Sequence, residues 1–209
     1  MTTKPVNSSQ LIEWGVAARA LPGESVSGDL HLVKPFSKGV LLAVVDGLGH
    51  GDKATAAAKL ATATLAEHAE ESVVSLVKRC HQAITKTRGV ALSLAALHAL
   101  EGTLAWLGVG NVEGILLRAD PSANPHSERV FLRAGVVGYQ LPVIAANVAP
   151  LSPGDLLIFV TDGIRSGFAE RLTTNEAPQP LANRILHQHF KGNDDALVLV
   201  ARYLGTNHE

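Results

Sequence analysis

The chain has 209 residues, of which 46% are hydrophobic and 18% are charged, and its formal net charge is −1. This size and apolar content predict one domain over residues 1–209, with a core at about 11–204. The balanced charge argues against nucleic-acid binding, and the apolar runs are too short for a membrane helix. The polar start "MTTKPVNSSQ" and the single cysteine, Cys80, indicate a cytoplasmic protein.

The first part of the chain alternates strands with two helices. Apolar residues occupy every position of Val40–Val45, which indicates a strand covered on both faces. Ser72 is a good helix cap, and Cys80 lies on the apolar face of the helix that would follow it. The other elements predicted here are strands at Leu11–Ala20 and Asp29–Lys34 and a helix at Asp52–Glu70.

The second part consists mainly of short strands separated by turns that contain Gly or Asn. Loops are expected at Asp120–Glu128 and Thr173–Pro180, and a helix at Leu181–His189. The pattern predicts an α+β fold, a four-layer αββα sandwich in which two antiparallel sheets pack face to face with helices outside. The strands expected in this part are Val90–Leu97, Thr103–Gly108, Gly114–Leu117, Arg129–Arg133, Leu156–Thr161 and Ala196–Tyr203.

Acidic residues recur at the ends of these strands. The segments "VLLAVVDG" and "LLIFVTDG" end buried strands at Asp46 and Asp162, while Asp29, Asp194 and Asp195 stand at the beginning of strands. Carboxylates gathered at one edge repel one another unless cations lie between them. An all-oxygen ligand set suits Mg²⁺ or Mn²⁺, and two such ions can activate a water for attack on phosphorus.

Two other interpretations of these segments stay open. Each Asp-Gly pair, taken alone, is typical of a turn that ends a strand. The segment "GLGHGDK" also follows a strand and opens a helix, as a nucleotide-binding loop would. Its glycines, Gly47, Gly49 and Gly51, do not have the G-x-G-x-x-G spacing, and Asp46 would repel the phosphates.

Six short motifs occur in an order that resembles a known family: "SGD", "DGLGHG", "TRGVALSLAAL", "GVGNV", "TDG" and "DDALVLV". They are similar to the motifs of the PPM-type, metal-dependent serine/threonine phosphatases, and especially to the bacterial SpoIIE-like branch. "KRCHQAITKTRG" followed by "GVGNV" resembles a small stand-alone phosphatase of the stressosome in that branch. The resemblance runs from about Val16 to Tyr203.

This resemblance implies a site with two Mn²⁺ or Mg²⁺ ions at one end of the sheets. Asp46 would bridge the ions and Gly47 would offer its carbonyl oxygen, the flexible glycine letting the backbone come close. Asp162 and Asp194 would be further ligands, and Asp29 would be a ligand or would hold a metal-bound water. These are the residues through which a metal-activated water would act.

The resemblance also implies roles around the ions. Asp195 would support the ligands, His50 is a candidate catalytic residue and Arg19 a candidate phosphate-binding residue. The substrate would be phosphoserine or phosphothreonine on a STAS-domain partner of the stressosome or anti-anti-sigma type. Many eukaryotic relatives carry a glutamate where this chain has Gly28 and a histidine where it has Leu48. A non-catalytic PPM-like module that binds a partner regulator is therefore the alternative.

Overall fold

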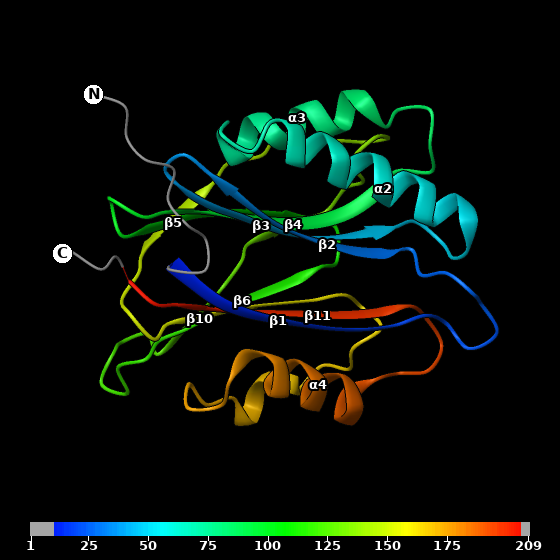
Figure 1. Cartoon of the computed structure of the whole chain (residues 1–209). Helices are drawn as coiled ribbons and strands as arrows, with labels where there is room; N and C mark the ends of the chain where they lie inside the picture. The colour runs from blue at the N-terminus through cyan, green and yellow to red at the C-terminus, as the bar shows by residue number, and fades with distance from the viewer. Residues whose placement is uncertain (1–10, 206–209) are drawn as a thin grey trace.

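The structure is a computed structural model that describes residues 11–205. These residues form two sheets stacked face to face, with helices against both outer faces (Figure 1). The predicted four-layer αββα sandwich is thereby confirmed. Among the described residues, no helix is both long and apolar enough to span a membrane.

The first sheet is antiparallel throughout. Helix α4 (Pro178–His189) covers its outer face, where it packs on the first and the last strand of the chain. A short 3₁₀ helix, η1 (Phe168–Arg171), lies on the way to α4. The strand order is β1 (Ile12–Arg19), β11 (Ala196–Tyr203), β10 (Leu156–Val160), β6 (Glu113–Leu117) and β7 (Ser127–Arg129).

The second sheet is covered by helices α2 (Asp52–Glu67) and α3 (Val73–Ala83). One of its strand pairs, β5 with β8, is parallel, so the expectation of two purely antiparallel sheets is wrong in this detail. The strand order is β2 (Asp29–Phe36), β3 (Gly39–Gly47), β4 (Val90–His98), β5 (Thr103–Val109) and β8 (Leu132–Arg133), and β9 (Asn147–Pro150) also pairs with β5.

Two predicted segments need correction. The strand expected at Arg129–Arg133 is divided between two strands. The chain pairs with β6 as β7, then leaves the first sheet and pairs with β5 of the second sheet as β8. The loop expected at Thr173–Pro180 ends earlier, since α4 already begins at Pro178. Proline suits the first turn of a helix, because backbone N–H groups there have no acceptor within the helix and the N–H that proline lacks is not needed. Strand β9 was not predicted.

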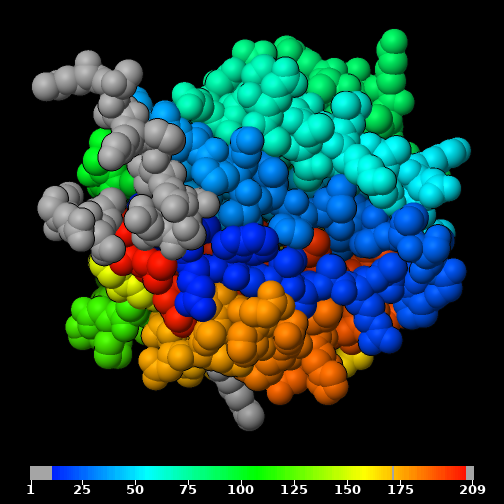
Figure 2. All heavy atoms as spheres, in the orientation of Figure 1, coloured from blue at the N-terminus to red at the C-terminus, as the bar shows by residue number. Residues whose placement is uncertain are grey.

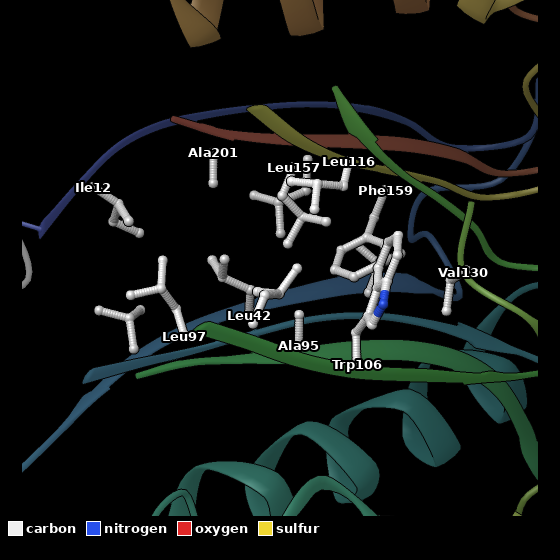
Figure 3. Close-up of a cluster of buried hydrophobic side chains, with 14 of the residues drawn as sticks. Ile12, Leu42, Ala95, Leu97, Trp106, Leu116, Val130, Leu157, Phe159 and Ala201 are labelled. Carbon is white, nitrogen blue, oxygen red and sulfur yellow. The ribbon is translucent and has the colours of Figure 1, made fainter. Parts of the chain in front are cut away.

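Strand β3 lies at the centre of the sandwich and is buried on both faces. Leu42 points between the sheets, where it packs with Leu97, Trp106 and Phe159 (Figure 3). Its neighbour Leu41 belongs to the layer between the second sheet and the helices, together with Cys80. This two-sided burial explains the uninterrupted apolar run. Figure 2 shows the same layers from outside, with α2 and α4 on either side of β1 and β2.

Candidate active site

Both sheets place aspartates at the same end of the sandwich. Asp46, near the end of β3, is the register partner of Asp29, the first residue of β2. In the other sheet Asp162 follows β10, and Asp194 and Asp195 precede the antiparallel strand β11. In Figure 1 this end lies at the right, where the β1–β2 loop and the start of α2 are found.

Hydrogen bonds join the two sheets at this end. The hydroxyl of Thr161 donates to Asp29 Oδ2 at 2.7 Å and accepts from the N–H of Leu197 at 2.8 Å. Asp29 is therefore held by a residue of the opposite sheet that lies 132 positions away in the sequence.

Asp195 holds the loop between β1 and β2. Its Oδ1 accepts from the N–H of Leu21 and its Oδ2 from the N–H of Gly28, both at 2.7 Å. It is almost fully buried. Both carboxylate oxygens are thus used by backbone donors, and the role expected for Asp195 around the ions stays a prediction.

The glycines of the two Asp-Gly pairs allow close backbone contacts. A Cβ on Gly47 would lie 2.2 Å from the carbonyl oxygen of Ala54 in α2, and a Cβ on Gly163 would lie 1.9 Å from that of Asp195. A Cβ on Gly28 would be 2.9 Å from the Cβ of Ala54, so the glutamate of some relatives would not fit here without a shift. The glycines thus let the segments that carry the aspartates approach neighbouring backbone closely.

The aspartates at this end are difficult to ionise together. Burial raises the pKa of Asp46 to about 8, and the neighbouring carboxylates, Asp29 foremost, add to the rise. Burial also raises the pKa of Asp29 to about 7, against the opposing effect of the hydrogen bond from Thr161. The pKa of Asp194 is likewise raised by burial, although the N–H of Asp195 opposes this. A cation between these groups would relieve the repulsion.

The donor set suits a hard divalent cation. All its side-chain donors are carboxylate oxygens, and among residues 11–205 none of the five aspartates forms an ion pair with Lys or Arg. Within the same range, no group of three or more His, Cys, Asp or Glu side chains is arranged so that it could hold a metal ion as it stands. The case for a cation here therefore rests on the carboxylate oxygens and on the repulsion between the aspartates, and not on an observed ligand geometry.

His50 and Arg19, the two predicted site residues that can carry a positive charge, have different surroundings in the structure. The ring nitrogen Nδ1 of His50 lies 2.6 Å from Glu24 Oε1, and the positive charge of a protonated His50 would lower the pKa of Asp194. His50 is thus held by Glu24 of the β1–β2 loop. The guanidinium of Arg19 instead stacks over the ring of Phe190, 4.9 Å from its centroid. The phosphate-binding role of Arg19 stays a prediction without a contact that supports it.

Three residues at this end were not among the predicted site residues. Asn111 donates from Nδ2 to Asp162 Oδ2 at 2.7 Å, Thr161 holds Asp29, and Glu24 holds His50. Asn111 belongs to the "GVGNV" motif, which offered a signal, and Thr161 belongs to "TDG". Nothing in the sequence marks Glu24, because its partner lies in another loop.

The fold of the described residues is that of the PPM-type serine/threonine phosphatases. A profile of the family Stage II sporulation protein E (SpoIIE) matches residues 37–204. The chain belongs to this SpoIIE family, and the resemblance deduced from the six motifs is confirmed.

Similar proteins place the chain within the family. It is 33% identical, over 184 residues, to phosphoserine phosphatase RsbX of Bacillus subtilis (strain 168). The match covers 86% of this chain and 89% of RsbX. This confirms the expected similarity to a stressosome phosphatase of the branch. A structure solved for "The bacterial stressosome: a modular system that has been adapted to control secondary messenger signaling" superposes with a TM-score of 0.82 at 28% identity, covering 91% of this chain and 99% of that one.

The fold is also that of RsbX crystallised with magnesium. That structure gives a TM-score of 0.82 at 23% identity and covers 93% of this chain and 96% of its own. Both this chain and these relatives are matched over nearly their whole length.

Proposed function

We propose that this enzyme hydrolyses phosphoserine or phosphothreonine on a bacterial regulatory protein, as a single domain in the cytoplasm. The observation that carries the proposal is the gathering of Asp29, Asp46, Asp162 and Asp194 at one end of the sandwich, with a raised pKa of about 8 for Asp46. A STAS-domain partner of the stressosome or anti-anti-sigma type is the substrate we favour, because the chain is similar to RsbX and to a stressosome structure.

Two Mn²⁺ or Mg²⁺ ions would be held by these four aspartates and the carbonyl of Gly47. When bound, the ions would polarise the phosphate oxygens and lower the pKa of a water molecule. The aspartates carry the charge that compensates the ions, and Asn111 keeps Asp162 in one orientation through its 2.7 Å hydrogen bond. Such bonds to a ligand restrict its position and tune the metal.

His50 is our candidate for moving a proton. When the ring is protonated, its Nδ1–H is taken up by Glu24, so its Nε2–H is the donor left for the departing serine oxygen. Asp195 would position His50 indirectly. It accepts two backbone hydrogen bonds that fix the β1–β2 loop, and this loop carries Glu24.

The central test is Asp46→Asn. We expect hydrolysis of p-nitrophenyl phosphate in MnCl₂ to fall by about 10³-fold or more, because a carboxylate that would hold the ions is lost. Asp120→Asn is the matched control: it makes the same chemical change on an exposed loop, and activity should be retained. A fully active Asp46→Asn enzyme would contradict the mechanism.

The alternative, a non-catalytic module that binds a partner regulator, has its own outcome. A folded wild-type protein that releases no phosphate from p-nitrophenyl phosphate or phosphoserine proteins, with MnCl₂ or MgCl₂ and relative to EDTA, would favour it. Metal-dependent release would exclude it.

A further inference from the structure

An open pocket lies beside the aspartate end, between helix α2 and the turn that follows α3. Lys53 and Ala56 line it from the helix, and Lys86, Thr87 and Arg88 line it from the turn. All three cationic side chains are exposed. Within residues 11–205 none of the three forms an ion pair, so their charges are available to a partner.

The turn that carries two of these cations is fixed by its own hydrogen bonds. The Thr87 hydroxyl donates to the carbonyl of Ile84 at 2.7 Å and accepts from the N–H of Gly89 at 3.0 Å. Lys86 and Arg88 therefore project from a backbone that is already ordered, which lowers the entropy lost when a partner binds.

The same turn touches the glycine loop that follows Asp46. The carbonyl of Gly89 accepts from the N–H of Leu48 at 3.1 Å. Above that loop, Nη1 of Arg88 lies only 2.6 Å from the position that a Cβ of Gly49 would take. Gly49 thus leaves room for the guanidinium, and the basic pocket is contiguous with the loop of the metal end.

Charges around the site are consequently divided. The carboxylates occupy the end of the sandwich, whereas uncompensated cations occupy the pocket next to it. A phosphoprotein that places its phosphoserine at the metal end lays the neighbouring part of its chain over adjacent surface. Complementary charges at such a rim orient a partner and speed its encounter.

We propose that the pocket of Lys53, Lys86 and Arg88 receives acidic side chains next to the phosphoserine of the substrate protein. The inference rests on the proposed function, because it assigns a partner surface to the same site. It makes Lys53 and Lys86 specificity determinants that act on the flanking chain, while the phosphate itself stays with the metal end.

Two synthetic phosphoserine peptides of equal length test this, one with Asp and Glu flanking the phosphoserine and one with Asn and Gln there. With MnCl₂ we expect kcat/KM to be about tenfold higher for the acidic peptide at about 50 mM NaCl, and the ratio to shrink at about 500 mM as the charges are screened. The variant Lys53→Glu/Lys86→Glu should lose the preference and keep wild-type hydrolysis of p-nitrophenyl phosphate.

Lys59→Glu/Lys78→Glu is the matched control, since both lysines are exposed on α2 and α3 and lie outside the pocket lining. It should keep the preference. Equal hydrolysis of both peptides by the wild type would overturn the inference and leave the proposed function intact. An equal loss with p-nitrophenyl phosphate in the Lys53/Lys86 variant would overturn it too, because the pocket would then bind the phosphate.

If no substrate is hydrolysed, the proposed function fails and the inference is tested separately. Fluorescence anisotropy of the labelled peptides with metal-free protein in EDTA then measures binding alone. Tighter binding of the acidic peptide, lost in Lys53→Glu/Lys86→Glu, would support the pocket, and equal binding would overturn it.

Discussion

The two ends of strand β10 carry aspartates in opposite situations. Asp155 precedes the strand, is fully buried, and accepts from Arg118 Nη1 at 3.0 Å and from the N–H groups of Ala119 and Ser152 at 2.8 and 3.0 Å. Asp162 follows the strand and accepts a single side-chain bond, from Asn111. Its other neighbours include carboxylates that raise one another's pKa.

The difference separates stability from function on one strand. At the Asp155 end the buried charge has a cation and backbone donors, so the network stabilises the fold. At the Asp162 end the charges lack cationic partners in the described part of the chain, so the fold holds them at a cost that an added cation would offset. Functional sites commonly break the rules of local stability that the remainder of a protein follows.

The largest effect is expected at the paired end. Asp155→Ala should lower the free energy of unfolding by about 3–5 kcal/mol, because the half-buried Arg118 loses a carboxylate and two backbone N–H groups lose their acceptor. Urea denaturation at neutral pH measures this. Arg118→Met should cost less, since both N–H bonds to Asp155 remain, and hydrolysis per folded molecule should stay at the wild-type level in both variants.

At the unpaired end, removal of a charge should act in the opposite direction. The folded pKa of Asp46 is about 8, against 3.8 for an ordinary aspartate, so the folded state keeps a proton that the unfolded state releases between these values. The metal-free protein should therefore lose a few kcal/mol of stability as the pH rises from about 4 to about 8. Thermal unfolding in EDTA across this range measures the loss.

Asp46→Asn should flatten this pH profile and unfold at a higher temperature than the wild type near the alkaline end. MnCl₂ should raise the unfolding temperature of the wild type there, because ligand binding to the folded state stabilises it. Identical pH profiles for the variant and the wild type would show that Asp46 does not cause the loss of stability with rising pH.

The smallest effect is expected from the hydrogen bond that Asp162 accepts from Asn111. Asn111→Ala should weaken Mn²⁺ binding about tenfold, as measured by isothermal titration calorimetry, because Asp162 loses its fixed orientation. Its stability should change by less than about 0.5 kcal/mol, since Asn111 is exposed. Asn175→Ala, also at an exposed position, should change neither quantity.

Much of the sandwich could be predicted because its central strands are buried on both faces. β3 and β10 appear in the sequence as unbroken apolar runs; β3 ends in an Asp-Gly pair, and β10 is followed by Thr161 and then by a second Asp-Gly pair. The aspartates could be proposed as a group for the same reason: the ends of strands in one core meet at its edge. Cys80 was expected in the core and is buried there, where burial raises the pKa of its thiol to about 12.

What could not be predicted depends on contacts between distant segments. The division of Arg129–Arg133 between two sheets follows from a crossing that leaves no mark in five residues. Glu24 and His50 belong to different loops, and Thr161 meets Asp29 only because the sheets are stacked. A linear pattern records which residues repeat, but it does not record which loops meet.

The hydrogen bond from Thr161 to Asp29 has a further consequence for how such a protein can evolve. It joins Asp29 of one sheet to Thr161, the residue before Asp162, at the end of a strand in the other sheet. The distance between the two aspartates therefore depends on the thickness of the side-chain layer in which Trp106 and Phe159 lie (Figure 3). A core substitution that keeps the chain folded but alters that thickness would displace one half of the proposed ion-binding end relative to the other. If this end is catalytic as proposed, substitutions in the interior are limited by the geometry of the site before they are limited by folding.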